Sequence, residues 1–182
     1  MGHRVSFLVA SLGFAVATSG CAPATAPSSA LLERSPALLG RSATRGSALP
    51  PIALTTLAGD KAELATLAHG RVALVSLWAT WCEACEREMD ALNRLDARTG
   101  TDAVVIGVAV GEERDHVAAF VRQRGLRYAQ LVDPDFVFAD AVGQRRLPAT
   151  LVVDRSGRIV FRGEALDVAG LEALKRAVAA AD

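Results

Sequence analysis

The stretch that decides the fold is Val72-Ala73-Leu74-Val75-Ser76-Leu77-Trp78-Ala79-Thr80-Trp81-Cys82-Glu83-Ala84-Cys85. Its first half, residues 72–78, is an almost unbroken apolar run, which is typical of a strand buried on both faces of a sheet. Beyond it the side chains follow a helical period, with one face formed by Cys85, Glu88, Met89, Leu92 and Leu95. The two cysteines are therefore predicted to lie where a buried strand ends and a helix begins.

Strand and helix signals continue to alternate toward the C-terminus. The sequence predicts a strand over Ala103–Val110, a helix that ends at Gly125, a weaker strand over Arg127–Val132, a short helix over Pro134–Val142, strands over Ala149–Val153 and Ile159–Arg162, and a last helix with Val168, Leu171, Leu174 and Val178 on one side. Such a succession predicts an α/β fold with a mixed central sheet flanked by helices.

Composition excludes several classes of protein. The chain has 182 residues, 20 Lys+Arg against 20 Asp+Glu, and 51% hydrophobic residues. Balanced charge without a basic cluster argues against nucleic acid as a partner, and the hydrophobic content argues against disorder throughout. Three cysteines are too few for a small domain held together by disulfides. We expect one compact domain with appendages.

The first 21 residues have the pattern of an export signal. A basic start precedes an apolar run over Val5–Ala17, which is too short to cross a bilayer comfortably, and small residues stand before Cys21. This pattern resembles a bacterial lipoprotein signal, in which Cys21 would carry the lipid. Cleavage by an ordinary signal peptidase and an uncleaved anchor remain alternatives, and all three place the domain outside the cytoplasm.

A second segment, residues 22–50, links this signal to the domain. It is rich in Pro, Ser and Gly and has no sustained apolar periodicity, so it cannot bury enough surface to offset chain entropy. We interpret it as a flexible tether between the membrane and a domain that spans residues 51–182.

The position of the cysteine pair favours thiol chemistry. At a helix start, unpaired backbone N–H groups and the helix dipole stabilise an anion, so the thiol nearest that start, Cys82, has a depressed pKa and is partly thiolate. The two-residue spacer puts Cys85 about one turn away, close enough to form a disulfide with Cys82. An accessible attacking sulfur and a second, resolving sulfur are what thiol–disulfide exchange requires.

These motifs together resemble a known family. Trp-Ala-Thr-Trp-Cys-x-x-Cys after an apolar strand, Glu88 three residues beyond the second cysteine, and Leu147-Pro148-Ala149-Thr150 at a later strand are similar to the TlpA/ResA-like branch of the thioredoxin superfamily. The resemblance runs from about residue 51 to the C-terminus. It implies a thioredoxin-like fold with an inserted strand–helix unit over residues 127–142.

The resemblance also implies roles for individual residues. Cys82 would attack a target disulfide and Cys85 would resolve the mixed disulfide. Pro148 would be a cis-proline beside the pair, with the Leu147 backbone free to bind an incoming peptide. Glu88 would handle a proton, and its place at i+3 from Cys85 puts both on one helix face.

The implied function is that of an extracytoplasmic protein disulfide oxidoreductase. By analogy it would mostly reduce protein disulfides, with apocytochrome c as a frequent client and a membrane thiol–disulfide protein as electron donor, and it would need no cofactor or metal. Trp81, next to the nucleophile, is expected to shape the partner surface, whereas Trp78 is expected in the core.

Several simpler interpretations compete with these. The cysteine pair could be a structural disulfide, Glu88 a solvated carboxylate and Pro148 a trans residue at an edge strand, whereas zinc lacks enough ligands at workable spacing. His69, His116, Asp133 and Asp154 are interpreted as surface or turn residues. Competing functions are a peroxiredoxin-like thiol peroxidase and a non-catalytic module that binds a partner or copper.

Overall fold

The computed structural model describes residues 46–180, so the predicted signal peptide, Cys21 and most of the predicted tether lie outside the described residues. The elements are β1 (Ala53–Thr56), β2 (Lys61–Glu63), α1 (Leu64–Ala68), β3 (Val72–Trp78), α2 (Glu83–Thr99), β4 (Ala103–Val110), α3 (Arg114–Arg124), β5 (Ala129–Asp133), α4 (Val137–Ala141), β6 (Ala149–Val153), β7 (Ile159–Gly163) and α5 (Val168–Ala179). The alternation that the sequence predicts from residue 72 onward is confirmed. The first three elements, β1, β2 and α1, were not predicted.

Within residues 46–180, seven strands form one mixed sheet in the order β2-β1-β5-β4-β3-β6-β7. Strands β3, β4 and β5 run parallel, and the strands outside them pair antiparallel. The carboxyl ends of the three parallel strands therefore meet at one edge of the sheet. This edge is where the cysteine motif follows β3.

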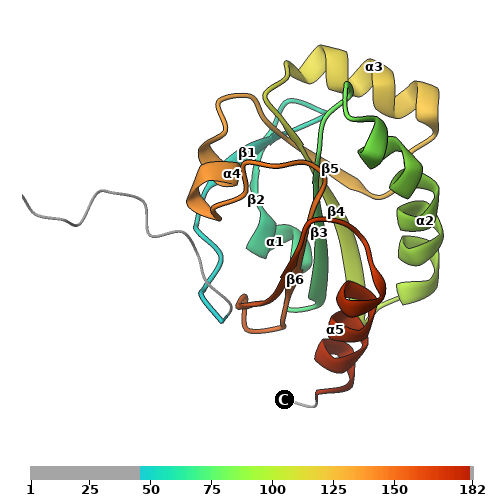
Figure 1. Cartoon of the computed structure of the whole chain (residues 1–182). Helices are drawn as coiled ribbons and strands as arrows, with labels where there is room; N and C mark the ends of the chain where they lie inside the picture. Colours follow the sequence, from blue (N-terminus) through green and yellow to red (C-terminus); the bar gives the residue numbers. More distant parts are fainter. Residues whose placement is uncertain (1–45, 181–182) are drawn as a thin grey trace, which may run out of the picture. The chain divides into compact units, whose positions relative to one another are not determined.

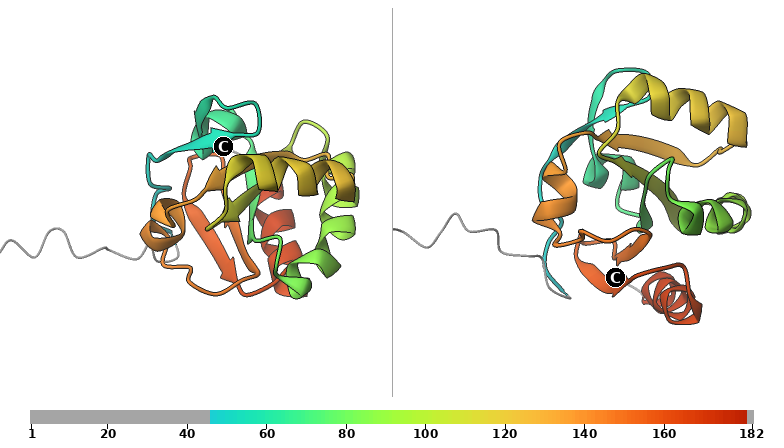
Figure 2. Two further views of the ribbon diagram at one scale, coloured as in Figure 1. Left: turned by 90° about the horizontal axis from the view of Figure 1, so that it is seen from above. Right: turned by 45° about the horizontal axis from the view of Figure 1, so that its top comes forward.

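Helices cover both faces of the sheet, as Figures 1 and 2 show. On one face, α2, α3 and α5 pack against alternate sheet residues such as Leu74 and Val105; on the other, α1 and α4 pack against residues such as Val75 and Ile106. Every residue of β3 is buried. Burial on both faces explains why this strand is apolar at every position except Ser76.

The structure corrects two sequence predictions. Residues 46–50, which were assigned to the tether, belong to the fold: Gly46 N donates to Ile159 O, Leu49 N donates to Gly157 O at 2.9 Å, and Ala48 pairs with Arg158. Val168 does not face the core, since 76% of it is exposed. The buried side of α5 is formed by Gly170, Ala173 and Leu174.

None of the helices between residues 46 and 180 has the length and apolar character needed to cross a membrane.

Candidate active site

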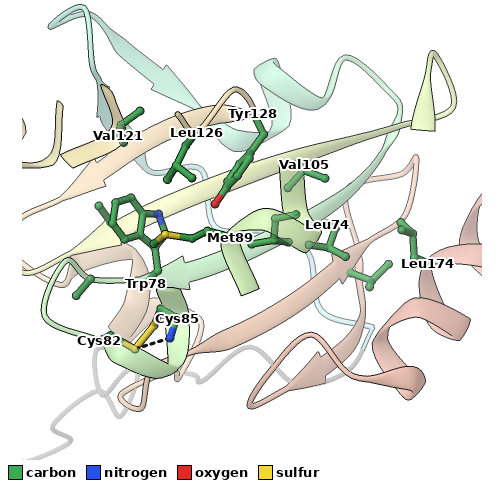
Figure 3. Close-up of a cluster of buried hydrophobic side chains, with 14 of the residues drawn as sticks. Leu74, Trp78, Cys82, Cys85, Met89, Val105, Val121, Leu126, Tyr128 and Leu174 are labelled. Carbon is green, nitrogen blue, oxygen red and sulfur yellow. Dashed lines mark hydrogen bonds between the residues drawn. A yellow bond between two sulfur atoms is a disulfide. The ribbon is translucent and has the colours of Figure 1, made fainter. Parts of the chain in front are cut away.

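The two cysteines of the motif are joined in a disulfide. The S–S distance is 2.08 Å and the Cα atoms of Cys82 and Cys85 lie 5.2 Å apart. Cys82 ends the turn after β3, where its N–H donates to Ala79 O at 3.1 Å, and Cys85 lies in the first turn of α2. Figure 3 shows the pair at the end of a cluster of buried side chains. The predicted juxtaposition of the two sulfurs is therefore present.

Local backbone geometry favours negative charge on the Cys82 sulfur. Cys82 is the N-cap of α2, and its Sγ accepts a hydrogen bond from Cys85 N at 3.2 Å. An N-cap side chain that accepts from the first turn occupies the positive end of the helix dipole. Glu83, also in the first turn, is exposed and acidic and opposes this effect. The helix start thus stabilises a thiolate, while a neighbouring carboxylate limits that stabilisation.

Trp81 lies exposed directly before the buried cysteine pair. In the disulfide form Cys82 is only 6% exposed and Cys85 2%, whereas Trp81 is 67% exposed. A large aromatic side chain that stands in solvent directly before a reactive sulfur offers an apolar contact for a partner. This position agrees with the expected partner surface, and the role itself stays a prediction.

Glu88 is half-buried on α2, one helical turn beyond Cys85. Its Oε1 accepts a hydrogen bond from Leu166 N at 3.1 Å, while its Oε2 is buried and has no partner among the described residues. Burial raises the pKa of the Glu88 carboxyl, and the Leu166 hydrogen bond and Arg87 lower it less. The group is thus not a freely solvated carboxylate. The proton-handling role that the resemblance implies for Glu88 is consistent with a carboxyl of raised pKa and remains a prediction.

The predicted cis-proline is present. The Leu147–Pro148 peptide bond is cis. Because Ala149 pairs with Leu77 in the antiparallel register of β6 and β3, Pro148 lies next to the end of β3, directly before the cysteine motif. Leu147 is half-buried and packs against both core clusters. The geometry fits the implied peptide-binding role of these two residues, which remains a prediction.

The floor of the site contains polar atoms inside the core. Trp78 is 1% exposed, as expected, and its Nε1 donates to Gln130 Oε1 at 3.1 Å. Its ring also contacts Phe120, with centroids 5.5 Å apart. Figure 3 shows Tyr128 directed toward the same region, and burial raises the pKa of Tyr128 to about 12, so its phenol stays neutral. The indole is thus held in place from β5 and α3.

Sequence reasoning missed a polar cluster beside the cysteine turn, formed by Thr80, Glu112 and His116. Thr80 N donates to Glu112 Oε2 at 2.7 Å, Thr80 Oγ1 donates to Glu112 Oε1, and His116 Nε2 lies 3.0 Å from Thr80 Oγ1. His116 is exposed but not free of contacts. The surface position expected for His116 is confirmed, whereas the prediction for Asp133 was wrong: it is 1% exposed and its Oδ2 accepts from the first turn of α4.

Most of the chain is similar to a known protein family and to proteins within it. Residues 45–162 match the AhpC/TSA family. The thiol-disulfide oxidoreductase ResA of Geobacillus thermodenitrificans is 32% identical over 115 residues, which cover 63% of this chain and 66% of that protein. The match thus spans just under two thirds of that relative.

Solved structures share the fold. A secreted thiol-disulfide isomerase from Corynebacterium glutamicum superposes with a TM-score of 0.60 at 27% identity, covering 71% of this chain and 83% of that one. A thiol:disulfide interchange protein from Bacteroides sp. gives a TM-score of 0.67 at 20% identity, covering 78% and 94%. These likenesses confirm the thioredoxin-like fold expected from the motifs.

Proposed function

The chain belongs to the AhpC/TSA family, and from this premise we propose that it is a protein thiol–disulfide oxidoreductase that works through Cys82 and Cys85. The observation that carries the proposal is the disulfide between these residues at the start of α2, with Cys82 Sγ accepting from a backbone N–H. A disulfide in this position is the oxidised state of an exchange centre. The names of the related proteins support the same chemistry.

The proposed cycle moves two electrons from the reduced pair to a target disulfide. The Cys82 thiolate attacks one target sulfur, the target S–S bond breaks, and the released target thiolate takes up a proton. Cys85 then loses its proton and attacks Cys82 Sγ, which releases the second target thiolate and forms the Cys82–Cys85 disulfide. Glu88, on the same helix, would accept the proton of Cys85 and return it to the solvent or to the leaving thiolate.

Substrate contact is proposed at the surface around the pair. Trp81 would offer an apolar contact, and the Leu147 backbone beside cis-Pro148 would pair with an extended segment of the target. A disulfide-bearing polypeptide fits this arrangement because main-chain hydrogen bonds accept many sequences while the sulfur chemistry selects the site.

Cellular placement is part of the proposal. An export signal over residues 1–21 with lipidation at Cys21, followed by the tether, would hold the domain on the outer side of the membrane. There a membrane thiol–disulfide protein would re-reduce the pair, and apocytochrome c cysteines are proposed as clients by analogy with the ResA relatives.

Two assays test the activity. With a dithiol reductant, the full chain is expected to reduce insulin disulfides, and Cys82→Ser is expected to abolish this. Cys85→Ser is expected to stop turnover but accumulate a mixed disulfide on Cys82, which can be isolated from the native cell envelope and identified.

The competing functions are distinguished by two further measurements and by the trapping assay. Peroxide consumption faster than insulin reduction would favour a thiol peroxidase. Partner binding that survives both serine substitutions would favour a non-catalytic module. Absence of a trapped mixed disulfide, under conditions that trap one with a related enzyme, would contradict the proposed cycle.

A further inference from the structure

A hydrogen-bonded cluster joins the cysteine turn to the segment that follows β4. Glu112 accepts two hydrogen bonds from Thr80, one from its backbone N–H at 2.7 Å and one from its hydroxyl. Both carboxylate oxygens of Glu112 therefore accept hydrogen bonds from Thr80, which lies two positions before Cys82. The Glu112 side chain is only 9% exposed, although it lies at the surface edge of the sheet. Contacts of this kind fix the path of the turn.

The third member, His116, lies in the first turn of α3, four residues after Glu112. Its Nε2 is 3.0 Å from Thr80 Oγ1 and 3.6 Å from Glu112 Oε1. Because the Thr80 hydroxyl gives its proton to Glu112, it accepts from His116, which requires a proton on Nε2. This is not a nucleophile triad, since there the acid contacts the imidazole nitrogen opposite the hydroxyl. The cluster has a positioning geometry.

We propose that Glu112 is a positioning residue for thiol exchange, which holds the turn before Cys82 through Thr80 and whose charge opposes the Cys82 thiolate. The inference rests on the proposed function for its biological meaning. It assigns to Glu112 the task of keeping the pair from becoming strongly oxidising, because a thiolate that is stabilised too well favours the reduced form. The helix start stabilises the Cys82 thiolate, and the negative charge of Glu112 destabilises it.

Distance and charge set the size of the effect. The Cys82 sulfur is two residues from Thr80 along a tight turn, so the Glu112 carboxylate lies within roughly 10 Å of it. At that distance and an effective dielectric constant of about 20 to 40, one charge shifts a pKa by roughly half a unit to one unit. Removing the charge is expected to lower the pKa of the Cys82 thiol by that amount.

The test measures the pKa of Cys82 in a full chain in which it is the only thiol. The chain has three cysteines, so Cys21→Ser and Cys85→Ser leave Cys82 alone, and its ionisation is followed by thiolate absorbance against pH. Glu112→Gln is nearly isosteric and its amide can still accept from Thr80 N. It is expected to lower the Cys82 pKa by about half a unit or more and to speed reaction with a disulfide probe at neutral pH.

Glu113→Gln is the matched control. It removes the same charge one residue further on, where the side chain is exposed and makes no cap hydrogen bond. Solvent screening is expected to keep its effect below half of that of Glu112→Gln. If Glu112 has only a structural role, Glu112→Gln would alter thermal stability without shifting the pKa of Cys82 more than Glu113→Gln does.

A second pair of variants tests the inference without substituting Glu112, in case Glu112→Gln fails to fold. His116 has a 66% exposed side chain, so His116→Lys and His116→Gln are tolerated at the surface. The lysine adds a positive charge beside Glu112 and is expected to lower the Cys82 pKa relative to the glutamine. Equal shifts for Glu112→Gln and Glu113→Gln, or no difference between the two His116 variants, would overturn the inference. Failure of the parent chain to reduce insulin would instead reject the proposed function. The titrations of Cys82 would still test the inference about Glu112, because they do not depend on that activity.

Discussion

Replacing Glu88 with glutamine is expected to change stability and redox turnover in opposite directions. Glu88 Oε1 accepts from Leu166 N, and Oε2 is buried without a partner among residues 46–180. Burial, the largest influence, raises the pKa of this carboxyl above its ordinary value. The folded protein therefore holds the Glu88 proton more tightly than the unfolded chain does.

The sign of the stability effect follows from this difference in proton binding. A carboxyl with a raised pKa in the folded state contributes stability that is fully present below its unfolded pKa of about 4.3 and is lost as the pH rises through the folded value. Glutamine stays neutral at every pH and keeps an oxygen for Leu166. Relative to the parent, Glu88→Gln is expected to gain stability on going from about pH 4 to about pH 8. Because Glu88 is half-buried, solvent screening keeps that gain below about 1 kcal/mol.

Turnover is expected to fall because glutamine cannot take up the proton of Cys85. Loss of a general base slows its step by about 10²-fold or more. The step is isolated by forming a mixed disulfide between Cys82 and thionitrobenzoate, whose release reports attack by Cys85. The parent rate is expected to rise with pH as Glu88 ionises, and the variant is expected to lack this rise.

Asp90→Asn, an exposed change on the same helix, is the control and should alter neither quantity. An unchanged rate of thionitrobenzoate release in Glu88→Gln would refute proton transfer by Glu88. A stability difference that does not vary between acidic and alkaline pH would refute the burial argument itself.

Three further substitutions test the packing around the site, each by urea unfolding. In Gly107→Ala, a Cβ would lie 2.2 Å from Gln130 Oε1, so the buried bond to the indole breaks and stability falls by about 2 kcal/mol, with altered tryptophan fluorescence. In Thr150→Val, a buried hydroxyl that has no partner within residues 46–180 is removed, and stability rises by about 1 kcal/mol. In Asp133→Ala, Phe138 N and Ala139 N lose their acceptor, at a cost of about 2 kcal/mol that Asp133→Asn partly avoids.

The elements that position the cysteines were predictable because their local signals agree. The nearly unbroken apolar run of β3, the helical period of α2 and the apolar run of β4 each have one interpretation at their length. Burial on both sheet faces then requires helices on both sides, which fixes the fold class. The cis conformation of Pro148 came only from family resemblance, since no local signal separates it from a trans proline.

Other parts could not be predicted from local pattern. Strands β1 and β2 have four and three residues and pair with each other at the edge of the sheet, so neither shows enough alternation to be recognised. Val168 fits the helical period of α5, but it directly follows the N-cap Asp167 and is 76% exposed. Periodicity predicts on which side of a helix a residue lies. It does not predict whether another element packs against the helix at that position along its axis.

The residues missed at the candidate site share one cause, and it suggests a rule. Thr80 follows β3 by two residues, and Glu112 follows β4 by two. Because the carboxyl ends of parallel strands meet at one edge, polar residues at these positions converge even though 32 residues separate Thr80 from Glu112. An acid directly after a parallel strand is thus better interpreted as a partner of the neighbouring strand ends than as a solvated surface charge. This distinction separates Glu112, whose side chain is 9% exposed, from the exposed Glu113 beside it. Substitution of Glu112 should therefore shift the pKa of Cys82 more than twice as far as substitution of Glu113.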